Sequence, residues 1–119
     1  MMLDSAMYIP TFDDMLEAHA RIEPYINRTP VRTSAFLNEL TGAEMYFKCE
    51  NFQEPGAFKV RGATNAVFGL SDDQAKLGVA THSSGNHASC LSYAASRRGI
   101  PCNVVMPTTA PQAKKDTVR

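Results

Sequence analysis

The sequence predicts an α/β fold in which parallel strands are covered by helices on both faces. Residues 78–82 read GVATH, a short apolar segment, and the polar turn SSGN follows them directly. Residues 87–98 are rich in Ala and Ser and are followed by Gly99, which is typical of a helix and its end. A second strand is expected at residues 102–106. The order strand, turn, helix, strand therefore indicates a parallel unit with a crossover helix.

The preceding part of the chain contains signals for further helices and one further strand. They predict helices at 11–26, 34–40 and 59–70 and a strand at 43–51. Thr11 is the expected N-cap of the first helix, and Pro24 is expected to weaken or end it. Gly42 should end the second helix, residues 28–34 (RTPVRTS) should be extended, and Pro111 should begin a final helix.

The composition argues against several classes of protein. The 119 residues contain 12 Lys and Arg and 12 Asp and Glu, and a net charge of zero disfavours binding to nucleic acid or a membrane surface. No apolar run approaches the roughly 18 residues that a spanning helix needs. The N-terminal residues lack the basic and apolar regions of a signal peptide. Cys49, Cys90 and Cys102 form no CxxC motif and are expected to be buried and reduced, so a cytoplasmic protein is predicted.

Residues 81–88 (THSSGNHA) are predicted to form an anion-binding turn between a strand and a helix. Ligands of parallel α/β folds bind at the carboxyl ends of strands, where the N–H groups and the dipole of the next helix favour negative charge. Gly85 allows a ligand to approach the backbone, and Ser83, Ser84 and Asn86 add polar groups. A small carboxylate or phosphate is the expected ligand. The alternative is that Ser84 or Asn86 only caps the helix.

His82, His87 and Cys90 are the metal-ligand types nearest to this turn. The turn separates the two histidines, and no fourth ligand lies nearby in the sequence. No metal site is therefore assigned within the chain.

Lys59 is the candidate nucleophile. A lysine near a helix start is usually a solvated surface charge. This one follows a turn at Gly56 and the apolar Phe58, and it stands at the positive end of the predicted helix. That potential and partial burial would both favour the neutral amine, which can attack a carbonyl and form a Schiff base. Arg61 is given no catalytic role and is expected to pair with an acidic residue.

Two stretches together resemble one enzyme family. They are FKCENFQEPGAFKVRGA (residues 47–63) and THSSGNHA, and in this order they resemble the fold-type II pyridoxal-phosphate enzymes, whose architecture is tryptophan synthase β-like. Within that family they look most like the serine/threonine dehydratase and serine racemase branch. RTPV (residues 28–31) and PTTAPQAKKDTVR (residues 107–119) also match that branch. The sulfur-amino-acid branch fits less well, because its asparagine turn usually carries Thr and Gly before the Asn.

The resemblance implies a role for each motif residue. Lys59 would hold pyridoxal 5′-phosphate covalently as a Schiff base and would later act as the base at the substrate Cα. Phe58 would lie against the pyridine ring, and Asn86 would hydrogen-bond the 3′ oxygen of the cofactor. The substrate carboxylate would be held by the turn formed by Ser83, Ser84, Gly85, Asn86 and His87. Ser84 would lie on the cofactor face opposite Lys59 and would be a second catalytic residue.

The implied activity is that of an ammonia-lyase, or dehydratase, that converts L-serine or L-threonine to a 2-oxo acid and ammonia. Ser84 adds racemisation of serine as a second expected reaction, because a hydroxyl there can give or take a proton on the second face. Many threonine dehydratases carry alanine at this position, whereas 3-hydroxyaspartate dehydratases share the serine. The alternatives are therefore a 3-hydroxyaspartate dehydratase or a truncated, non-catalytic homologue that acts as a binding or regulatory subunit.

The chain is also expected to be the front portion of a larger protein, because its last helix has only begun at the end and its sheet has few strands. Residues 1–75 would begin the larger cofactor domain, and residues 76–119 would begin a smaller α/β domain. The resemblance places the phosphate loop, the partner of the pyridine nitrogen and a divalent-metal site further along. The 119-residue chain alone is therefore expected to bind the cofactor weakly and to be inactive, whereas the full-length form is expected to be a homodimer.

Overall fold

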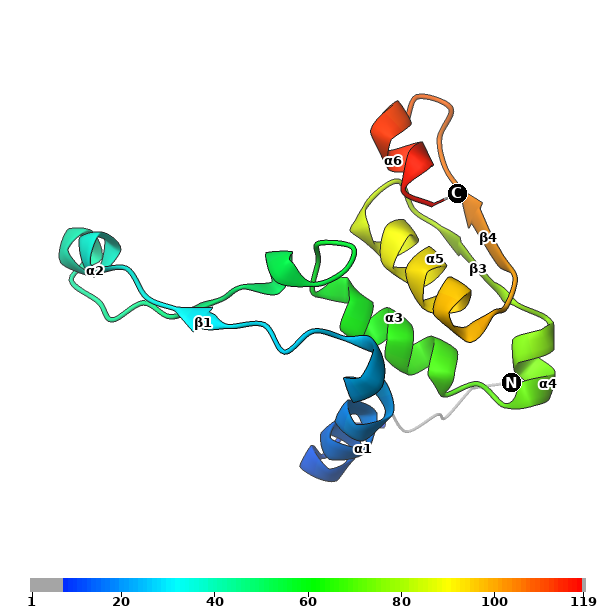
Figure 1. Cartoon of the computed structure of the whole chain (residues 1–119), viewed down its shortest axis with the longest axis horizontal. Helices are drawn as coiled ribbons and strands as arrows, with labels where there is room; N and C mark the ends of the chain where they lie inside the picture. The colour runs from blue at the N-terminus through cyan, green and yellow to red at the C-terminus, as the bar shows by residue number, and fades with distance from the viewer. Residues whose placement is uncertain (1–7, 119) are drawn as a thin grey trace, which may run out of the picture.

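The computed structural model describes residues 8–118 and has the predicted α/β unit (Figure 1). β3 (Val79–His82) and β4 (Cys102–Val105) are parallel, with Val79 opposite Cys102 and His82 opposite Val105. α5 (Asn86–Arg98) connects them and ends at Gly99, whose φ of 72° is left-handed. The prediction of a parallel unit with a crossover helix is confirmed.

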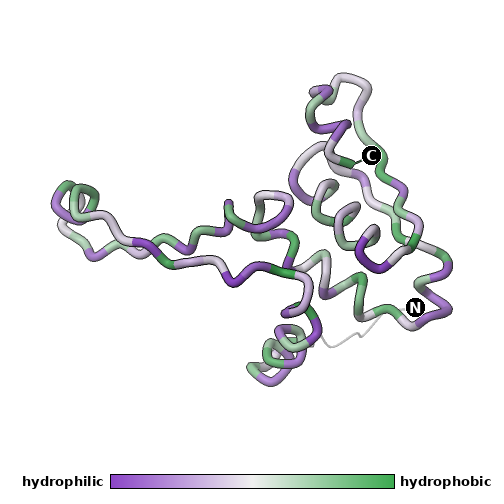
Figure 2. Tube along the Cα trace, in the orientation of Figure 1, coloured by the Kyte–Doolittle hydropathy of each residue, from purple (hydrophilic) through white to green (hydrophobic). Residues whose placement is uncertain are grey.

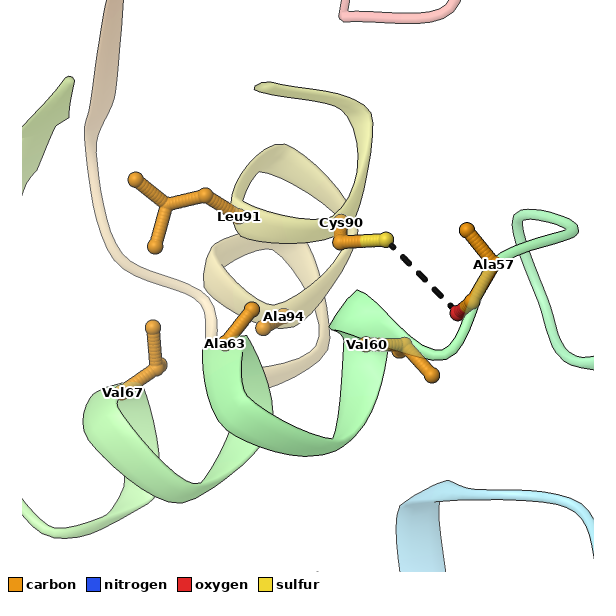
Figure 3. Close-up of a cluster of buried hydrophobic side chains, with 7 residues drawn as sticks. All are labelled: Ala57, Val60, Ala63, Val67, Cys90, Leu91 and Ala94. Atoms are coloured by element: carbon orange, nitrogen blue, oxygen red, sulfur yellow. Dashed lines mark hydrogen bonds between the residues drawn. The ribbon is translucent and has the colours of Figure 1, made fainter. Parts of the chain in front are cut away.

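The centre of the fold is a pair of helices, α3 (Lys59–Phe68) and α5, which pack side by side (Figure 3). Their shared core contains mostly small side chains: Ala57, Val60, Ala63, Val67, Cys90, Leu91 and Ala94. Cys90 near the start of α5 contacts the carbonyl of Ala57, which precedes α3. Arg98 at the end of α5 donates to the carbonyls of Val67 and Leu70 at the end of α3. The two helices therefore run in the same direction, and their N-termini lie at the same end of the pair.

This core also joins the two predicted domains. The predicted boundary after residue 75 falls inside α4 (Asp72–Lys76), and α3 and α5 lie on opposite sides of it in the sequence. The division into a larger and a smaller domain stays a prediction. Cys90 is buried as expected, whereas Cys49 and Cys102 are only half-buried, which corrects the prediction for these two thiols.

α1 (Phe12–Ile22) packs beside α3 and begins as predicted. Thr11 accepts a hydrogen bond from the N–H of Asp14, and the Asp14 carboxylate accepts one from the N–H of Thr11, which forms a capping box. The regular helix ends at Ile22, earlier than the predicted residue 26, because Pro24 lies in the 3₁₀ turn η1 (Glu23–Tyr25) that follows.

An arm formed by residues 28–49 extends away from the helix pair (Figure 1). It consists of β1 (Val31–Arg32) and β2 (Phe47–Lys48), which are antiparallel, with α2 (Ala35–Thr41) at the tip. Gly42 ends α2 with a φ of 69°, as predicted, whereas Ser34, expected as the first helical residue, is the N-cap. Figure 2 shows that hydrophobic residues occur along this arm as well as in the helix pair.

The predicted strand at residues 43–51 is too long. β2 has only two residues because β1, the strand that pairs with it, offers only two. The chain then enters the 3₁₀ turn η2 (Glu50–Phe52). Strand length depends on pairing with a distant segment, which the local alternation of residue types cannot indicate.

The base of the arm is attached to α3 by Glu50. Its carboxylate accepts two hydrogen bonds from Arg61, from Nε and Nη2, both at 2.8 Å. It also accepts one from the Thr29 hydroxyl at 2.5 Å. The Arg61 interaction, above all, lowers the pKa of Glu50 from its usual 4.5 to about 2. Glu50 is thus the acidic partner that the sequence predicted for Arg61 without identifying it.

Two further elements complete the described chain. Gly78 precedes β3 with a φ of 77°, and a Cβ there would lie 2.5 Å from the carbonyl oxygen of Pro101. α6 (Gln112–Asp116) follows Pro111, which is the N-cap rather than the first helical residue. Within residues 8–118, no helix is long and apolar enough to cross a membrane.

Candidate functional site

Lys59 is the first residue of α3, and its side chain is exposed. The turn around Gly56, whose φ is 88°, directs the chain into the helix. The Lys59 Nζ lies 5.6 Å from the centre of the Phe58 ring, and that ring is itself 61% exposed. The expected partial burial of Lys59 is therefore not found in the described chain. None of the described acidic side chains forms an ion pair with this lysine.

The start of α5 carries the predicted anion-binding turn. Gly85 is at the N-cap position, and its N–H donates to the Ser83 hydroxyl at 3.2 Å. No side chain caps this helix within the described chain, so the interpretation of Ser84 or Asn86 as a cap is wrong. Asn86 is the first helical residue and is exposed, as are Ser84 and His87. The first N–H groups of α5 therefore remain available to a ligand.

The N-termini of α3 and α5 lie at the same end of the parallel pair. Figure 3 shows the Cys90 side chain pointing from α5 toward the carbonyl of Ala57, with the sulfur 4.0 Å from that oxygen. Burial raises the pKa of the Cys90 thiol, and the positive charge of Lys59 acts on it in the opposite direction. Lys59 is therefore electrostatically close to the start of α5. The positive ends of two helix dipoles and one ammonium group act at the same place.

The beginnings of these two helices differ from those of α1, α2 and α4, whereas α6 also begins without a side-chain cap. α1, α2 and α4 each begin with a Thr or Ser side chain that accepts a backbone N–H bond. α3 and α5 begin without such a bond. The free N–H groups and the free amine make this end of the pair suitable for an anion that also carries a carbonyl.

A shallow hollow lies beside the turn, at the carboxyl ends of β3 and β4. Its volume is about 370 Å³. The residues that line it are His82, Ser83, Ser84, Val105, Met106 and Pro107. Hollows of similar or larger size lie elsewhere, and one of them is lined by residues of α1 and of the arm base. The hollow at the strand ends includes the predicted site residues Ser83 and Ser84.

The potential metal ligands near the turn do not come together. His82 at the end of β3 and His87 at the start of α5 are both exposed. Among residues 8–118, no three His, Cys, Asp or Glu side chains are grouped closely enough to hold a metal ion.

The structure adds Lys114 to the residues near the turn. Its Nζ lies 3.2 Å from Oδ1 of Asn86, although the two residues are 28 positions apart in the sequence. Sequence reasoning missed this contact because nothing local to α6 indicates which part of the chain its lysines will reach. The contact of Cys90 with Ala57 was also missed, because the two residues are 33 positions apart in the sequence.

Comparison with known proteins identifies the family. The family described as "Pyridoxal-phosphate dependent enzyme" matches residues 22–119. The chain belongs to this family. The match contains both α3 and α5, so the site described above is inside the region that the pyridoxal-phosphate dependent enzymes share with this chain.

Several members of the pyridoxal-phosphate dependent enzyme family are highly similar to the chain. A beta-hydroxyaspartate dehydratase of Paracoccus denitrificans (strain Pd 1222) is 82% identical over 113 residues, which are 95% of this chain and 36% of that protein. A serine racemase of Dictyostelium discoideum is 53% identical over 91% of this chain and 33% of that protein. The chain thus spans about a third of the length of the curated relatives it matches.

Solved structures confirm the fold. A maize serine racemase has a TM-score of 0.90 and 50% identity, over 93% of this chain and 34% of that one. A T.th. threonine deaminase has a TM-score of 0.84 and 41% identity, over 92% of this chain and 34% of that one. The predicted α/β fold of the fold-type II branch is therefore shown.

Proposed function

We propose that the protein is a pyridoxal-phosphate dependent ammonia-lyase that dehydrates small β-hydroxy amino acids, with Lys59 as the covalent attachment point. The proposal rests on one observation. The uncapped N-termini of α3 and α5 lie at the same end of the helix pair, and they present an exposed amine, Lys59, and an exposed amide, Asn86. An arrangement of free N–H groups and positive charge suits an anionic ligand, and a primary amine suits an aldehyde.

The residues at this end of the helix pair fit pyridoxal 5′-phosphate. The exposed Lys59 amine is accessible to an aldehyde, and the exposed Phe58 ring beside it offers an apolar face for a planar ring. Asn86 can hydrogen-bond a ring oxygen. The cofactor, when bound, supplies a carbonyl for amino groups and a ring that accepts the electron pair left at the substrate Cα.

Different residues of the chain would then bind the substrate and move its protons. The first N–H groups of α5 and the side chains of Ser83 and Ser84 bind the substrate carboxylate, which fixes the orientation of Cα. The Lys59 amine, once the substrate amino group has replaced it at the cofactor, would take the Cα proton, and the β-hydroxyl would leave as water with a proton returned by Lys59. Hydrolysis of the remaining unsaturated amine gives a 2-oxo acid and ammonia. Ser84 is proposed as the second proton carrier, which would allow serine racemisation beside dehydration.

The substrate is proposed to be L-serine or L-threonine, with β-hydroxyaspartate as the second candidate. The second candidate is favoured by one observation, the 82% identity to a protein named beta-hydroxyaspartate dehydratase. All three share the amino group, the carboxylate and the β-hydroxyl that the mechanism uses. The proposal also includes a cytoplasmic location, a homodimer in the full-length form, and a divalent metal that the C-terminal part of the full-length form could bind.

Borohydride reduction of the full-length protein with pyridoxal phosphate, followed by peptide mass spectrometry, tests the attachment point, because the 119-residue chain alone is expected to bind the cofactor weakly and to be inactive. Reduction makes the bond permanent, so the labelled lysine can be identified directly. We expect the label on Lys59, its loss in Lys59→Ala, and a fall in 2-oxo acid formation of about 10³-fold, because the general base is removed. Lys76→Ala, which removes an exposed lysine paired with Asp73, is the control and should behave like the parent protein.

The same preparations distinguish the alternatives. Rates of 2-oxo acid formation from L-serine, L-threonine and β-hydroxyaspartate, measured as kcat/KM, rank the substrates, and formation of D-serine measures racemisation. A label on a different lysine would contradict the attachment point. The absence of both label and product would favour the alternative of a non-catalytic binding or regulatory subunit.

A further inference from the structure

Lys114 connects α6 to the proposed site. Its ammonium group lies 3.2 Å from Oδ1 of Asn86, and the residue is half-buried. α6 is itself fixed against α5, because the Thr117 hydroxyl lies 2.8 Å from the hydroxyl of Ser89 and also donates to the carbonyl of Lys114. The position of Lys114 is therefore determined by contacts other than the one it makes with Asn86.

This contact determines which way the Asn86 amide faces. An ammonium group can only donate hydrogen bonds, so the amide oxygen must face Lys114. The amide NH₂ group then faces away from Lys114 and can donate to a second partner. Without Lys114 the amide could rotate by half a turn and present its oxygen instead, which would repel an oxygen of a ligand.

The charge of Lys114 is not balanced by a carboxylate in the described chain. Its neighbour on α6, Asp116, accepts a hydrogen bond from Gln112 at 2.8 Å. None of the ion pairs among the described residues includes Lys114. A cation at the start of α5 is electrostatically unfavourable, because the helix dipole is positive there, and Lys59 adds a further positive charge. An anionic oxygen bound at this point would relieve the repulsion.

We propose that Lys114 is a positioning residue that turns the Asn86 amide so that its NH₂ group donates to an anionic oxygen of the ligand at the N-termini of α3 and α5. The inference rests on the proposed function for the identity of that ligand, pyridoxal phosphate. The orientation of the amide depends only on the contact between Lys114 and Asn86.

The first test uses no cofactor. The side-chain NH₂ signals of Asn86 in a ¹⁵N NMR spectrum of the protein are assigned by their loss in Asn86→Ser. We expect Lys114→Met to shift or broaden these signals and Lys114→Arg to retain most of the native shift. Lys115→Met is the matched control, because that lysine lies on the same helix and donates to the carbonyl of Thr108 instead. Unmoved Asn86 signals in Lys114→Met would overturn the orientation.

The second test measures the dissociation constant of the full-length protein for pyridoxal phosphate by absorption titration. Loss of one charge-assisted positioning contact should weaken binding about tenfold in Lys114→Met, and Lys114→Arg should restore most of the affinity. Equal affinity in Lys114→Met and Lys115→Met would overturn the role of Lys114 in ligand binding. Failure of the proposed function is seen separately, as a lack of label on Lys59 in the parent protein, and it leaves the NMR result intact.

Discussion

At the scale of single residues, Thr64 is the least satisfied side chain in the described core. It lies on α3, is fully buried, and its hydroxyl has no hydrogen-bond partner among residues 8–118. A buried hydroxyl that has lost its water and gained no partner costs free energy. Thr64 should therefore reduce stability relative to an apolar side chain of the same shape.

Two substitutions test this expectation. Thr64→Val replaces the hydroxyl with a methyl group and should raise the free energy of unfolding by about 1 kcal/mol. Thr64→Ser keeps the hydroxyl but removes a buried methyl group, so it should lower that free energy by about 1 kcal/mol. Urea unfolding followed by circular dichroism measures both. A Thr64→Val variant less stable than the parent would show that the hydroxyl has a partner in solution.

The sequence predicted single residues best where their surroundings are local. Lys59 and Asn86 stand inside contiguous motifs. Lys59 begins a helix as predicted, and Asn86 begins α5 one residue before the predicted start at His87. The contacts of Lys114 with Asn86 and of Glu50 with Arg61 could not be predicted, because each contact joins two separate segments of the chain. The exposure of Lys59 was also missed, since burial depends on what packs around a residue rather than on its neighbours in the chain.

At the scale of elements, Arg98 holds the C-terminal end of α3 against α5. Its side chain is 16% exposed. It donates to the carbonyl of Val67 and, at 2.9 Å, to that of Leu70. A guanidinium at the end of a helix adds a charged donor to the terminal carbonyls and opposes the negative end of the dipole. Arg98 thus fixes the end of α3 opposite to the one that carries Lys59.

Replacing Arg98 should loosen the helix pair. Arg98→Gln is expected to lower the free energy of unfolding by about 2 kcal/mol, because partly buried carbonyls lose a charged donor. The neighbouring Arg97 is exposed and lies over the Tyr93 ring, so Arg97→Gln should change stability by less than about 0.5 kcal/mol. Thermal and urea unfolding of the two variants give the comparison, and equal losses would contradict the role of Arg98.

Helix ends were more predictable than strand lengths for a physical reason. Thr11, Ser34, Gly42 and Gly99 act within one turn of the helix they begin or end, and the structure places each of them there. The strand predicted at residues 43–51 is limited to Phe47–Lys48, because its length depends on pairing with β1.

At the scale of the whole molecule, the arm is joined to the helix pair by polar contacts at its base. Glu50 bonds to Arg61 of α3 and to Thr29, and Lys48 donates to the carbonyl of Thr29 at 2.6 Å. Gln53 is buried, and its side chain donates to the carbonyl of Asn27 at 2.8 Å. The orientation of the arm therefore depends on an ionised carboxylate.

Acid should weaken this attachment. The pKa of Glu50 is lowered from 4.5 to about 2 in the folded protein, chiefly by the hydrogen bonds from Arg61. The resulting stability is therefore fully present above pH 4.5 and is lost as the pH falls from 4.5 toward 2. Between about pH 5 and 3, the parent protein should lose about 1 kcal/mol more stability than Glu50→Gln.

Unfolding midpoints measured across this pH range test the prediction. Glu39→Gln is the control, because Glu39 is an exposed carboxylate on α2, and this variant should follow the parent. Parallel pH profiles for the parent and Glu50→Gln would contradict the role of Glu50.

The parallel packing of α3 and α5 also has a consequence for synthesis. Every residue of their shared core lies between Ala57 and Ala94, and the contacts that hold the far end need nothing beyond Arg98. The helix pair that aligns Lys59 with Asn86 can therefore assemble on the ribosome as soon as Arg98 has left the exit tunnel. The proposed site would then begin as a folded nucleus to which later segments attach.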